Sequence, residues 1–278
     1  MSVSAELLAL AESLNRSTLL PSVKRVYIPE PIPVAGKDPD FGLIELDDGS
    51  CGLFYAWLGE SQNGISGRFA ADEFVGEPAL TAARYIAGAH DMERSIGVAA
   101  INAISQHFFR RAKVALSDSR NSMGGFDLRP GDCLGMIGNF PSLVRQANLR
   151  AVPVIVVERK AHMFEERAGV RISDDPESLL SCNKIICTAS TLINNSVDEM
   201  LGFCKHADHI AMIGPSASFF PDPLFQRGVT VLGGSVALDA DKFIAGQISG
   251  DGVRDWMRRY SLERVTYPGT EPLIRNLQ

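Results

Sequence analysis

The stretch Asp132–Pro141 reads D-C-L-G-M-I-G-N-F-P and guides the interpretation of the rest of the chain. It is a short apolar run that ends in a glycine turn, Gly138-Asn139-Phe140-Pro141, and passes into a helical pattern over 142–149. A second apolar run, Val152–Val157, follows and ends at Glu158. Strand, glycine turn, helix, strand and acidic residue is the order found in the first half of a dinucleotide-binding βαβ unit. The stretch therefore predicts a Rossmann-like layer.

The glycine turn has features that suit an anionic ligand. Glycines let backbone N–H groups come close to a ligand, and a helix that starts at Pro141 adds its positive dipole end. Glu158 lies 20 residues after Gly138, where a ribose-binding carboxylate stands in dinucleotide-binding proteins. A full G-x-G-x-x-G is absent, because Asn139-Phe140-Pro141 follows Gly138. The spacing makes NAD or S-adenosylmethionine an alternative ligand.

Downstream of this stretch, continuously apolar runs alternate with helical patterns. Continuous runs are typical of strands that are covered on both faces. The alternation predicts an α/β fold with an open, mostly parallel sheet and helices on both faces. The expected strands are 133–137, 152–157, 184–187, 209–213 and 229–232, and the expected helices are 142–149, 176–181, 191–205, 222–227, 239–249 and 253–260. An irregular tail is expected over 266–278.

Upstream, strands are followed by helices, which predicts an α+β unit. A D-D-G-S turn at 47–50 separates two β-rich runs and indicates a hairpin. The expected strands are 23–28, 41–46 and 51–58, and the expected helices are 5–14, 70–74, 78–87 and 92–109, with a proline-rich connector at 29–39 and a loop at 60–67. Residues 118–132 form the predicted linker. We therefore predict two domains, an α+β domain over 1–120 and a Rossmann-like α/β domain over 121–278.

Composition argues against several classes of function. The 278 residues carry a net charge of -6 with a pI near 5.4, whereas nucleic-acid binding needs a basic face. No apolar run approaches the roughly 18 residues of a membrane span. The five cysteines are odd in number and widely spread, which fits a reduced, cytoplasmic compartment. Cys204, His206 and His209 lack the spacing of a closed zinc site.

Three loops are expected to carry the chemistry, because ligands bind at the carboxyl ends of parallel strands. The first is Gly138-Asn139-Phe140. The second reads T-A-S-T-L-I-N-N-S over 188–196 and places Thr188, Ser190, Thr191 and Asn194 at a helix entrance. Plain N-capping explains one or two of these hydroxyls equally well. The third loop is Gly214-Pro215-Ser216.

In the first domain, Glu93 and Asn102 are polar residues on an otherwise apolar helix. A stripe of small residues on the same helix permits close packing against another element. The two polar side chains are either satisfied by neighbouring groups within the core, as most buried polar residues are, or they face the second domain.

Four stretches together resemble a known family. They read S-I-G-V-A-A-I-N-A-I (95–104), G-M-I-G-N-F-P-S-L-V (135–144), C-T-A-S-T-L-I-N-N-S-V-D-E-M-L (187–201) and A-M-I-G-P-S-A-S-F-F-P-D-P-L-F-Q-R-G-V (211–229). Over about 41–246 the chain is similar to a bacterial and archaeal family of proposed heavy-metal chelatases. The resemblance implies a domain like the N-terminal domain of enolase, joined to an atypical Rossmann-like domain, with a site in the cleft between them.

When the family's site is transferred to the matching motifs of this chain, the resemblance implies that the three loops lie in that cleft and that Glu93 and Asn102 face them from the first domain. Ala189 stands where relatives carry glycine. The enolase-like half does not imply enolase chemistry, since no set of magnesium-binding carboxylates can be located in the chain.

We expect a cytoplasmic protein that binds a small anionic or metal-chelating ligand in the cleft. The sequence does not identify a cofactor, and a divalent metal or metal chelate is the first candidate. The protein's role would lie in metal or cofactor metabolism. The first alternative is an enzyme that uses NAD or S-adenosylmethionine, and the second is a non-catalytic sensor or carrier. Neither a nucleic acid nor a membrane is an expected partner. Enzymatic turnover and homo-oligomer formation stay open.

Overall fold

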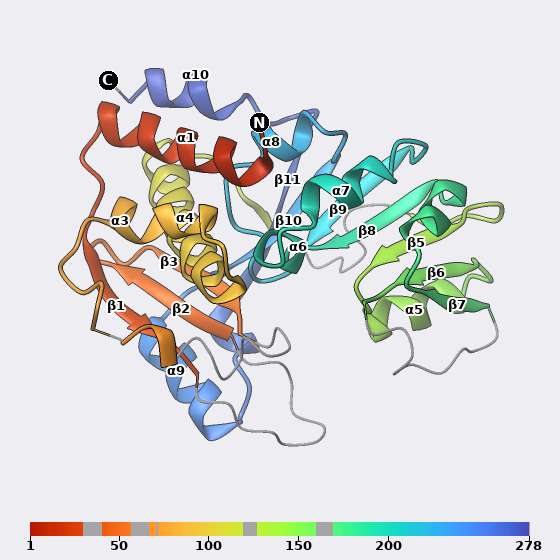
Figure 1. Ribbon diagram of the computed structural model, residues 1–278, viewed down its shortest axis with the longest axis horizontal. Coiled ribbons are helices and arrows are strands. Elements are labelled where there is room, and N and C mark those ends of the chain that lie inside the picture. Colours follow the sequence, from red (N-terminus) through yellow and green to blue (C-terminus); the bar gives the residue numbers. More distant parts are fainter. Residues whose placement is uncertain (30–40, 57–66, 71, 119–126, 160–168, 278) are drawn as a thin grey trace.

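The computed structural model describes residues 1–29, 41–56, 67–70, 72–118, 127–159 and 169–277, and these form two sheets with helices packed around them (Figure 1). The smaller sheet has three antiparallel strands, and the larger has eight. The α/β class, with a mostly parallel sheet, is therefore confirmed. Most of the connector over 29–39, of the loop over 60–67 and of the central linker lies outside the described residues.

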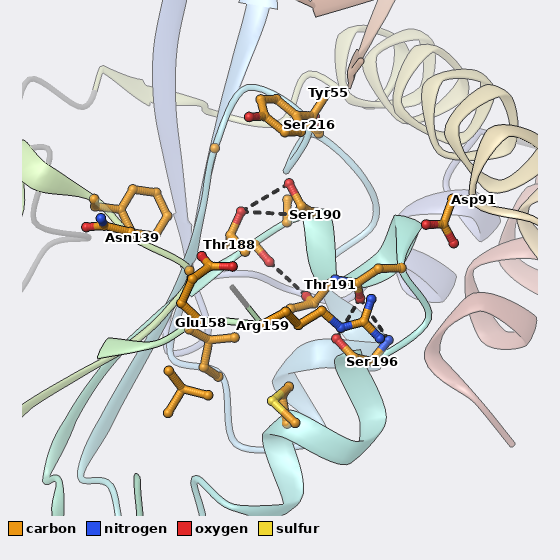
Figure 2. A pocket seen from close by; sticks show the side chains of 18 of the residues that line it. Tyr55, Asp91, Asn139, Glu158, Arg159, Thr188, Ser190, Thr191, Ser196 and Ser216 are labelled. Carbon is orange, nitrogen blue, oxygen red and sulfur yellow. Dashed lines mark hydrogen bonds between the residues drawn. The ribbon is translucent and has the colours of Figure 1, made fainter. Parts of the chain in front are cut away.

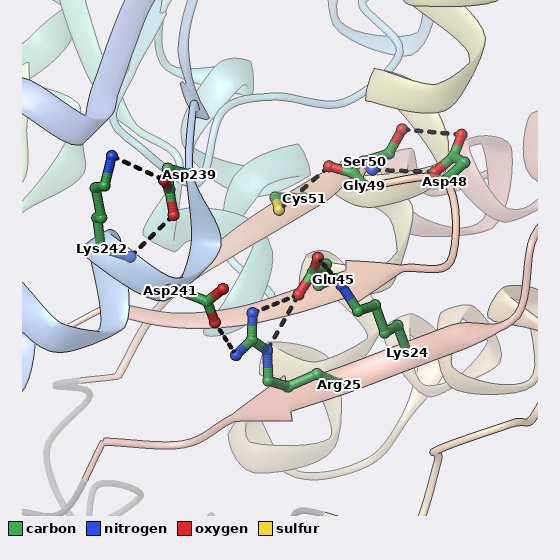
Figure 3. Close-up of polar contacts among 10 residues, drawn as sticks. All are labelled: Lys24, Arg25, Glu45, Asp48, Gly49, Ser50, Cys51, Asp239, Asp241 and Lys242. Carbon is green, nitrogen blue, oxygen red and sulfur yellow. Dashed lines mark hydrogen bonds and ion pairs between the residues drawn. The ribbon is translucent and has the colours of Figure 1, made fainter.

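The smaller sheet contains β1 (Val23–Tyr27), β2 (Phe41–Leu46) and β3 (Cys51–Tyr55) in that order. The hairpin between β2 and β3 is confirmed, with antiparallel pairing across the D-D-G-S turn. Gly49 has a φ of 80° there, a conformation that glycine adopts without strain. The side chain of Asp48 accepts a hydrogen bond of 3.0 Å from the Ser50 N–H and so closes the turn (Figure 3).

Helices cover this sheet on one face. They are α1 (Val3–Ser17), α3 (Ala79–Ala83), the 3₁₀ helix η2 (Arg84–Ala87) and α4 (Asp91–Arg111). The small residues of α4 let it lie almost against β3, because a Cβ added at Gly52 would come within 1.9 Å of the Ala99 carbonyl oxygen. Gly97 makes an equally close approach to Ile86 of η2. The expected helix over 70–74 is wrong, since residues 72–76 form turns.

The larger sheet is built from β5 (Leu134–Ile137), β6 (Val154–Val157), β7 (Val170–Ser173), β8 (Lys184–Thr188), β9 (His209–Ile213) and β10 (Val231–Ala237), all parallel. Their spatial order is β10-β9-β8-β5-β6-β7. If these six strands are numbered 1 to 6 along the chain from β5 and the sheet is read from β7 to β10, the order is 3-2-1-4-5-6, which is that of the Rossmann fold. The order reverses between β5 and β8, which is where such sheets bind ligands.

Both faces of this sheet are covered, which explains the continuous apolar runs. In β5, Leu134 and Met136 pack with α5 (Pro141–Asn148), whereas Ile137 joins the core on the opposite face. That opposite face carries η4 (Pro176–Ser181), α6 (Ser190–Ile193), α7 (Val197–Gly202) and α8 (Asp222–Phe225). The helices therefore follow the predicted alternation, although the one expected over 191–205 is divided in two.

Two further strands extend the sheet beyond β10. The strand β11 (Met257–Glu263) pairs antiparallel with β10, and β4 (Ser117–Asp118) pairs antiparallel with β11. The helix expected over 253–260 is therefore wrong: only a 3₁₀ turn, η5 (Arg254–Trp256), precedes β11. The edge of β10 offers backbone hydrogen bonds that a strand satisfies, and this pairing decides the conformation of the segment.

The tail expected to be irregular also contains a helix, α10 (Thr270–Arg275). Its first N–H group, at Thr270, donates to Asp222 of α8 over 2.9 Å, and α10 packs beside α1 (Figure 1). Both contacts are distant in sequence, so the local pattern gives no sign of them. Within the described residues, none of the helices combines the length and hydropathy that crossing a bilayer requires.

One hydrophobic core connects the two sheets. Phe54 of β3 and Phe108 of α4 belong to the same buried cluster as Phe220 and Leu232 from the larger sheet's side. On the outside, α9 (Ala240–Ser249) lies against β2 and is tied to the smaller sheet by Arg25. The guanidinium of Arg25 bonds Asp241 of α9 and the buried Glu45 of β2, each over 2.6 Å (Figure 3). The two-domain division at residue 120 stays a prediction.

Candidate functional site

A cavity of about 810 Å³ opens at the carboxyl ends of β5, β6, β8 and β9 and is bordered by β2 and β3 of the smaller sheet (Figure 2). It therefore lies at the reversal of strand order, and its size is that of a small-molecule site. Eleven of the thirteen residues predicted for the site line it: Gly138, Asn139, Phe140, Glu158, Thr188, Ser190, Thr191, Asn194, Gly214, Pro215 and Ser216. Whether they bind a ligand stays a prediction.

The first loop follows β5 and is shaped by Gly138. Its φ is 87°, and a Cβ added there would lie 2.9 Å from Cγ2 of Thr188. A side chain at this position would be strained and would crowd the second loop. The Gly138 N–H donates to the carbonyl of Val157 over 2.9 Å. This amide is therefore committed to the sheet, and Asn139 contributes a polar residue to the lining of the cavity (Figure 2).

The second loop, after β8, uses several of its hydroxyls to hold its own shape. Thr191 is 1% exposed, and its hydroxyl donates to the Thr188 carbonyl over 2.8 Å. The Thr188 hydroxyl accepts from the Ser190 N–H and contacts the Ser190 hydroxyl, each over 3.3 Å. Asn194 accepts from the N–H and the hydroxyl of Ser196. Thr188 and Ser190 are only half-buried and retain bonding capacity towards the cavity.

The third loop, after β9, begins at Gly214 with a φ of 138°. Ser216, two residues later, is 2% exposed. Its hydroxyl oxygen is buried and has no hydrogen-bond partner in the described structure, although the residue lines the cavity. Nearly all buried polar groups are hydrogen-bonded, and an unpaired one costs free energy. A ligand in the cavity would supply the missing partner if the Ser216 side chain turned towards it.

Two predicted residues lie outside this wall. Asn102 is fully buried, and its amide donates to the carbonyls of Leu53 and Ser216, each over 2.8 Å, while its oxygen accepts from the Ser218 N–H. It therefore joins β3, α4 and the third loop, and it positions the backbone at Ser216. Glu93 caps α4 by accepting from the His90 N–H over 3.2 Å. In this structure both residues therefore have a structural role, Asn102 as a link between elements and Glu93 as a helix cap.

The smaller sheet, α4, α7 and the segment after β7 contribute lining residues that the sequence motifs do not reveal. Tyr55 ends β3, and Asp91 begins α4 (Figure 2). The remaining ones that carry charge are Arg159, Asp174 and Glu199. Burial raises the pKa of Tyr55, and the nearby Glu158 carboxylate raises it further. This electrostatic coupling connects the smaller sheet with the end of β6.

A buried arginine fixes the corner where Asp91 stands. Arg94 is 7% exposed and donates to the carbonyls of Ile193, over 2.6 Å, and Gly88, over 2.8 Å, and its guanidinium also pairs with Asp91. Since Ile193 ends α6, this side chain ties α4 to the second loop. The local sequence does not predict this role of Arg94, because the Ile193 carbonyl that it binds lies 99 residues away.

The described residues do not form a direct site for a heavy-metal ion. No group of three or more His, Cys, Asp or Glu side chains is arranged to hold a metal ion in the part of the chain that the structure describes. The described lining of the cavity contains neither histidine nor cysteine, the residues that soft metals prefer. Burial also raises the pKa of Cys187 and of Cys204 to about 12, so these thiols stay protonated.

The fold and the cavity define a Rossmann-like α/β protein whose α+β layer covers the carboxyl edge of its parallel sheet. The chain belongs to the family described as "Putative heavy-metal chelation". Two family models with that description match residues 39–105 and 122–266. The family recognised from the sequence motifs is thereby confirmed.

Three relatives illustrate the similarity. An uncharacterized protein of Methanocaldococcus jannaschii is 25% identical over 162 residues, which cover 54% of this chain and 57% of that protein. A crystal structure from the same family, from Pyrococcus horikoshii, has a TM-score of 0.70 at 21% identity and covers 94% of this chain and 100% of its own. A second, from Desulfitobacterium hafniense, has a TM-score of 0.63 at 17% identity, covering 93% and 98%. At these identities the two structures show the shared fold alone.

Proposed function

We propose that the protein binds a metal chelate, a small molecule that itself supplies the ligands of the metal, in the cavity between the two sheets. The observation that carries the proposal is the buried, unpartnered hydroxyl of Ser216 in the wall of a cavity lined by three loops of the parallel sheet. The family description supports a connection with heavy metals.

The chemistry of the lining favours a chelate over a bare ion. Soft metals prefer thiolate, thioether or imidazole ligands. The described lining offers only one of these, the thioether of Met200, beside hydroxyl, amide and carboxylate groups. Such groups hydrogen-bond to the outside of an organic ligand. A cavity of about 810 Å³ is also far larger than one ion needs and lies within the range of small-molecule sites.

Isothermal titration calorimetry tests this proposal with nickel(II) chloride and with the neutral complex of nickel(II) and two histidines. We expect the complex to bind more tightly than the salt, and Asn139→Ala to weaken the binding about tenfold, the effect of losing about one hydrogen bond. Asn276→Ala, at an exposed position after α10, is the matched control. Equal binding of salt and complex, or no binding of nickel, cobalt and iron complexes of histidine and citrate, would count against the proposal.

A second candidate is an enzyme that uses NAD or S-adenosylmethionine. It is favoured by the Rossmann strand order and by Glu158, which lines the cavity at the end of β6, where a ribose-binding carboxylate stands. A nucleotide at about 100 times its dissociation constant stabilises the fold by about 2.7 kcal/mol. Thermal denaturation with each compound therefore decides this candidate, and Glu158→Gln should abolish any stabilisation.

A further inference from the structure

The charges around the cavity are strongly unequal. Four carboxylates line it, those of Asp91, Glu158, Asp174 and Glu199. Asp91 is already paired with the Arg94 guanidinium, so three lining carboxylates face a single lining guanidinium, that of Arg159, among the described residues. A cavity lined by one sign of charge attracts ligands of the opposite sign.

The hydrogen-bonding groups show the same imbalance. Carboxylates can only accept hydrogen bonds, and hydroxyls and the Asn139 amide can both accept and donate. Arg159 alone among the described lining side chains is restricted to donating. The wall is therefore rich in acceptors and favours a ligand rich in N–H or O–H donors.

Ser216 adds an unsatisfied hydroxyl to the wall of this acidic cavity. Its hydroxyl is buried and unpartnered, and the Ser216 carbonyl is held by the Asn102 amide over 2.8 Å. The backbone of the loop is thus fixed from behind, whereas the Ser216 side chain can still rotate about its Cα–Cβ bond towards a donor in the cavity. An N–H or O–H group of a ligand in the cavity would then donate a hydrogen bond to the Ser216 hydroxyl, which has no partner in the protein.

We infer that the cavity selects chelates with a net positive charge and N–H donors on their surface, and excludes anionic chelates of the same metal. This inference rests on the proposed function. It departs from the sequence-based expectation of an anionic ligand, because the glycine turn that suggested an anion commits the Gly138 amide to the sheet, while the carboxylates come from other elements.

Two inert cobalt(III) complexes of similar size test the inference, because neither exchanges its ligands with the protein. Tris(ethylenediamine)cobalt(III) is a cation with N–H donors on its surface, and the cobalt(III) complex of EDTA is an anion. Titration of the intact protein by calorimetry is expected to show at least about tenfold tighter binding of the cation. Raising the salt concentration from about 0.05 to about 0.5 M should weaken that binding, since both charges are partly exposed to solvent.

Matched variants locate the effect. Glu158→Gln and Glu199→Gln each remove one lining charge and should each weaken binding of the cationic complex about three- to tenfold. Glu271→Gln removes an equivalent charge from the exposed start of α10, outside the cavity lining, and should leave the affinity unchanged. Thermal denaturation confirms that each variant is folded.

Tighter binding of the anion, equal binding of both complexes, binding of neither, or an unchanged preference in the two cavity variants would each overturn the inference. The proposed function is decided separately by the neutral nickel complex. A protein that binds the neutral complex and also prefers the anionic cobalt complex would therefore keep the proposed function and lose the inference.

Discussion

Replacing Ser216 by alanine should change stability and ligand binding in opposite directions. The hydroxyl is buried without a partner, and a buried unpaired polar group costs about 1–3 kcal/mol. Its removal should therefore raise the free energy of unfolding of the ligand-free protein by about 1 kcal/mol, which is about 2 °C in melting temperature for a chain of this size. Chelate binding should become about tenfold weaker, since one hydrogen bond to the ligand is lost.

The neighbouring Ser218 offers a matched control. It is also fully buried, but its hydroxyl donates to the Ser235 carbonyl over 2.7 Å and accepts from the Ser235 N–H over 3.1 Å. Ser218→Ala should therefore lower the free energy of unfolding by about 1–3 kcal/mol. Urea denaturation measures both variants. If Ser216→Ala destabilised the protein as Ser218→Ala does, the Ser216 hydroxyl would have a partner in solution, and the reasoning behind the site would be refuted.

Three further predictions concern the surroundings of the site. Asn102→Ala should lower the free energy of unfolding by about 2–4 kcal/mol, because its amide satisfies three backbone groups; urea denaturation checks this, and a loss below about 1 kcal/mol would contradict it. The pKa of four buried thiols is raised to about 12, so stability should be full below about pH 9, where unfolded thiols stay protonated, and should fall as the pH rises towards 12. These thiols are Cys51, Cys182, Cys187 and Cys204. Urea midpoints that do not change above pH 9 would refute this. Burial would raise the pKa of Asp48, but the hydrogen bond from His107 and the charge of Arg110 outweigh it and hold that pKa well below its usual range. The stability advantage over Asp48→Asn should therefore be present above about pH 4 and shrink as the pH falls below it; an advantage that grows in acid would argue the opposite.

The order of elements in the parallel sheet could be predicted from local patterns. The apolar runs of β5, β6, β8 and β9 are continuous because helices cover both faces. The strands near the ends of the sheet are different. Most positions of β7 and β11 are exposed or only partly buried, so their apolar pattern is weak, and hydrogen bonds to a neighbouring strand decide their conformation. A pattern within the segment cannot show that neighbour.

The same division applies to the site. The three turns could be placed at the carboxyl edge from the sequence alone, because the carboxyl ends of parallel strands lie at the same edge of a sheet. Three features follow from the folded structure and from nothing local: Tyr55 and Asp91 line the same cavity as these turns, carboxylates outnumber cations in the described lining, and the Ser216 hydroxyl is unpaired. Asn102 and Ser216, which meet beside the cavity, are 114 residues apart. Turn and strand patterns arise from interactions between near neighbours, whereas the charge and bonding of a cavity wall depend on which distant elements pack against it.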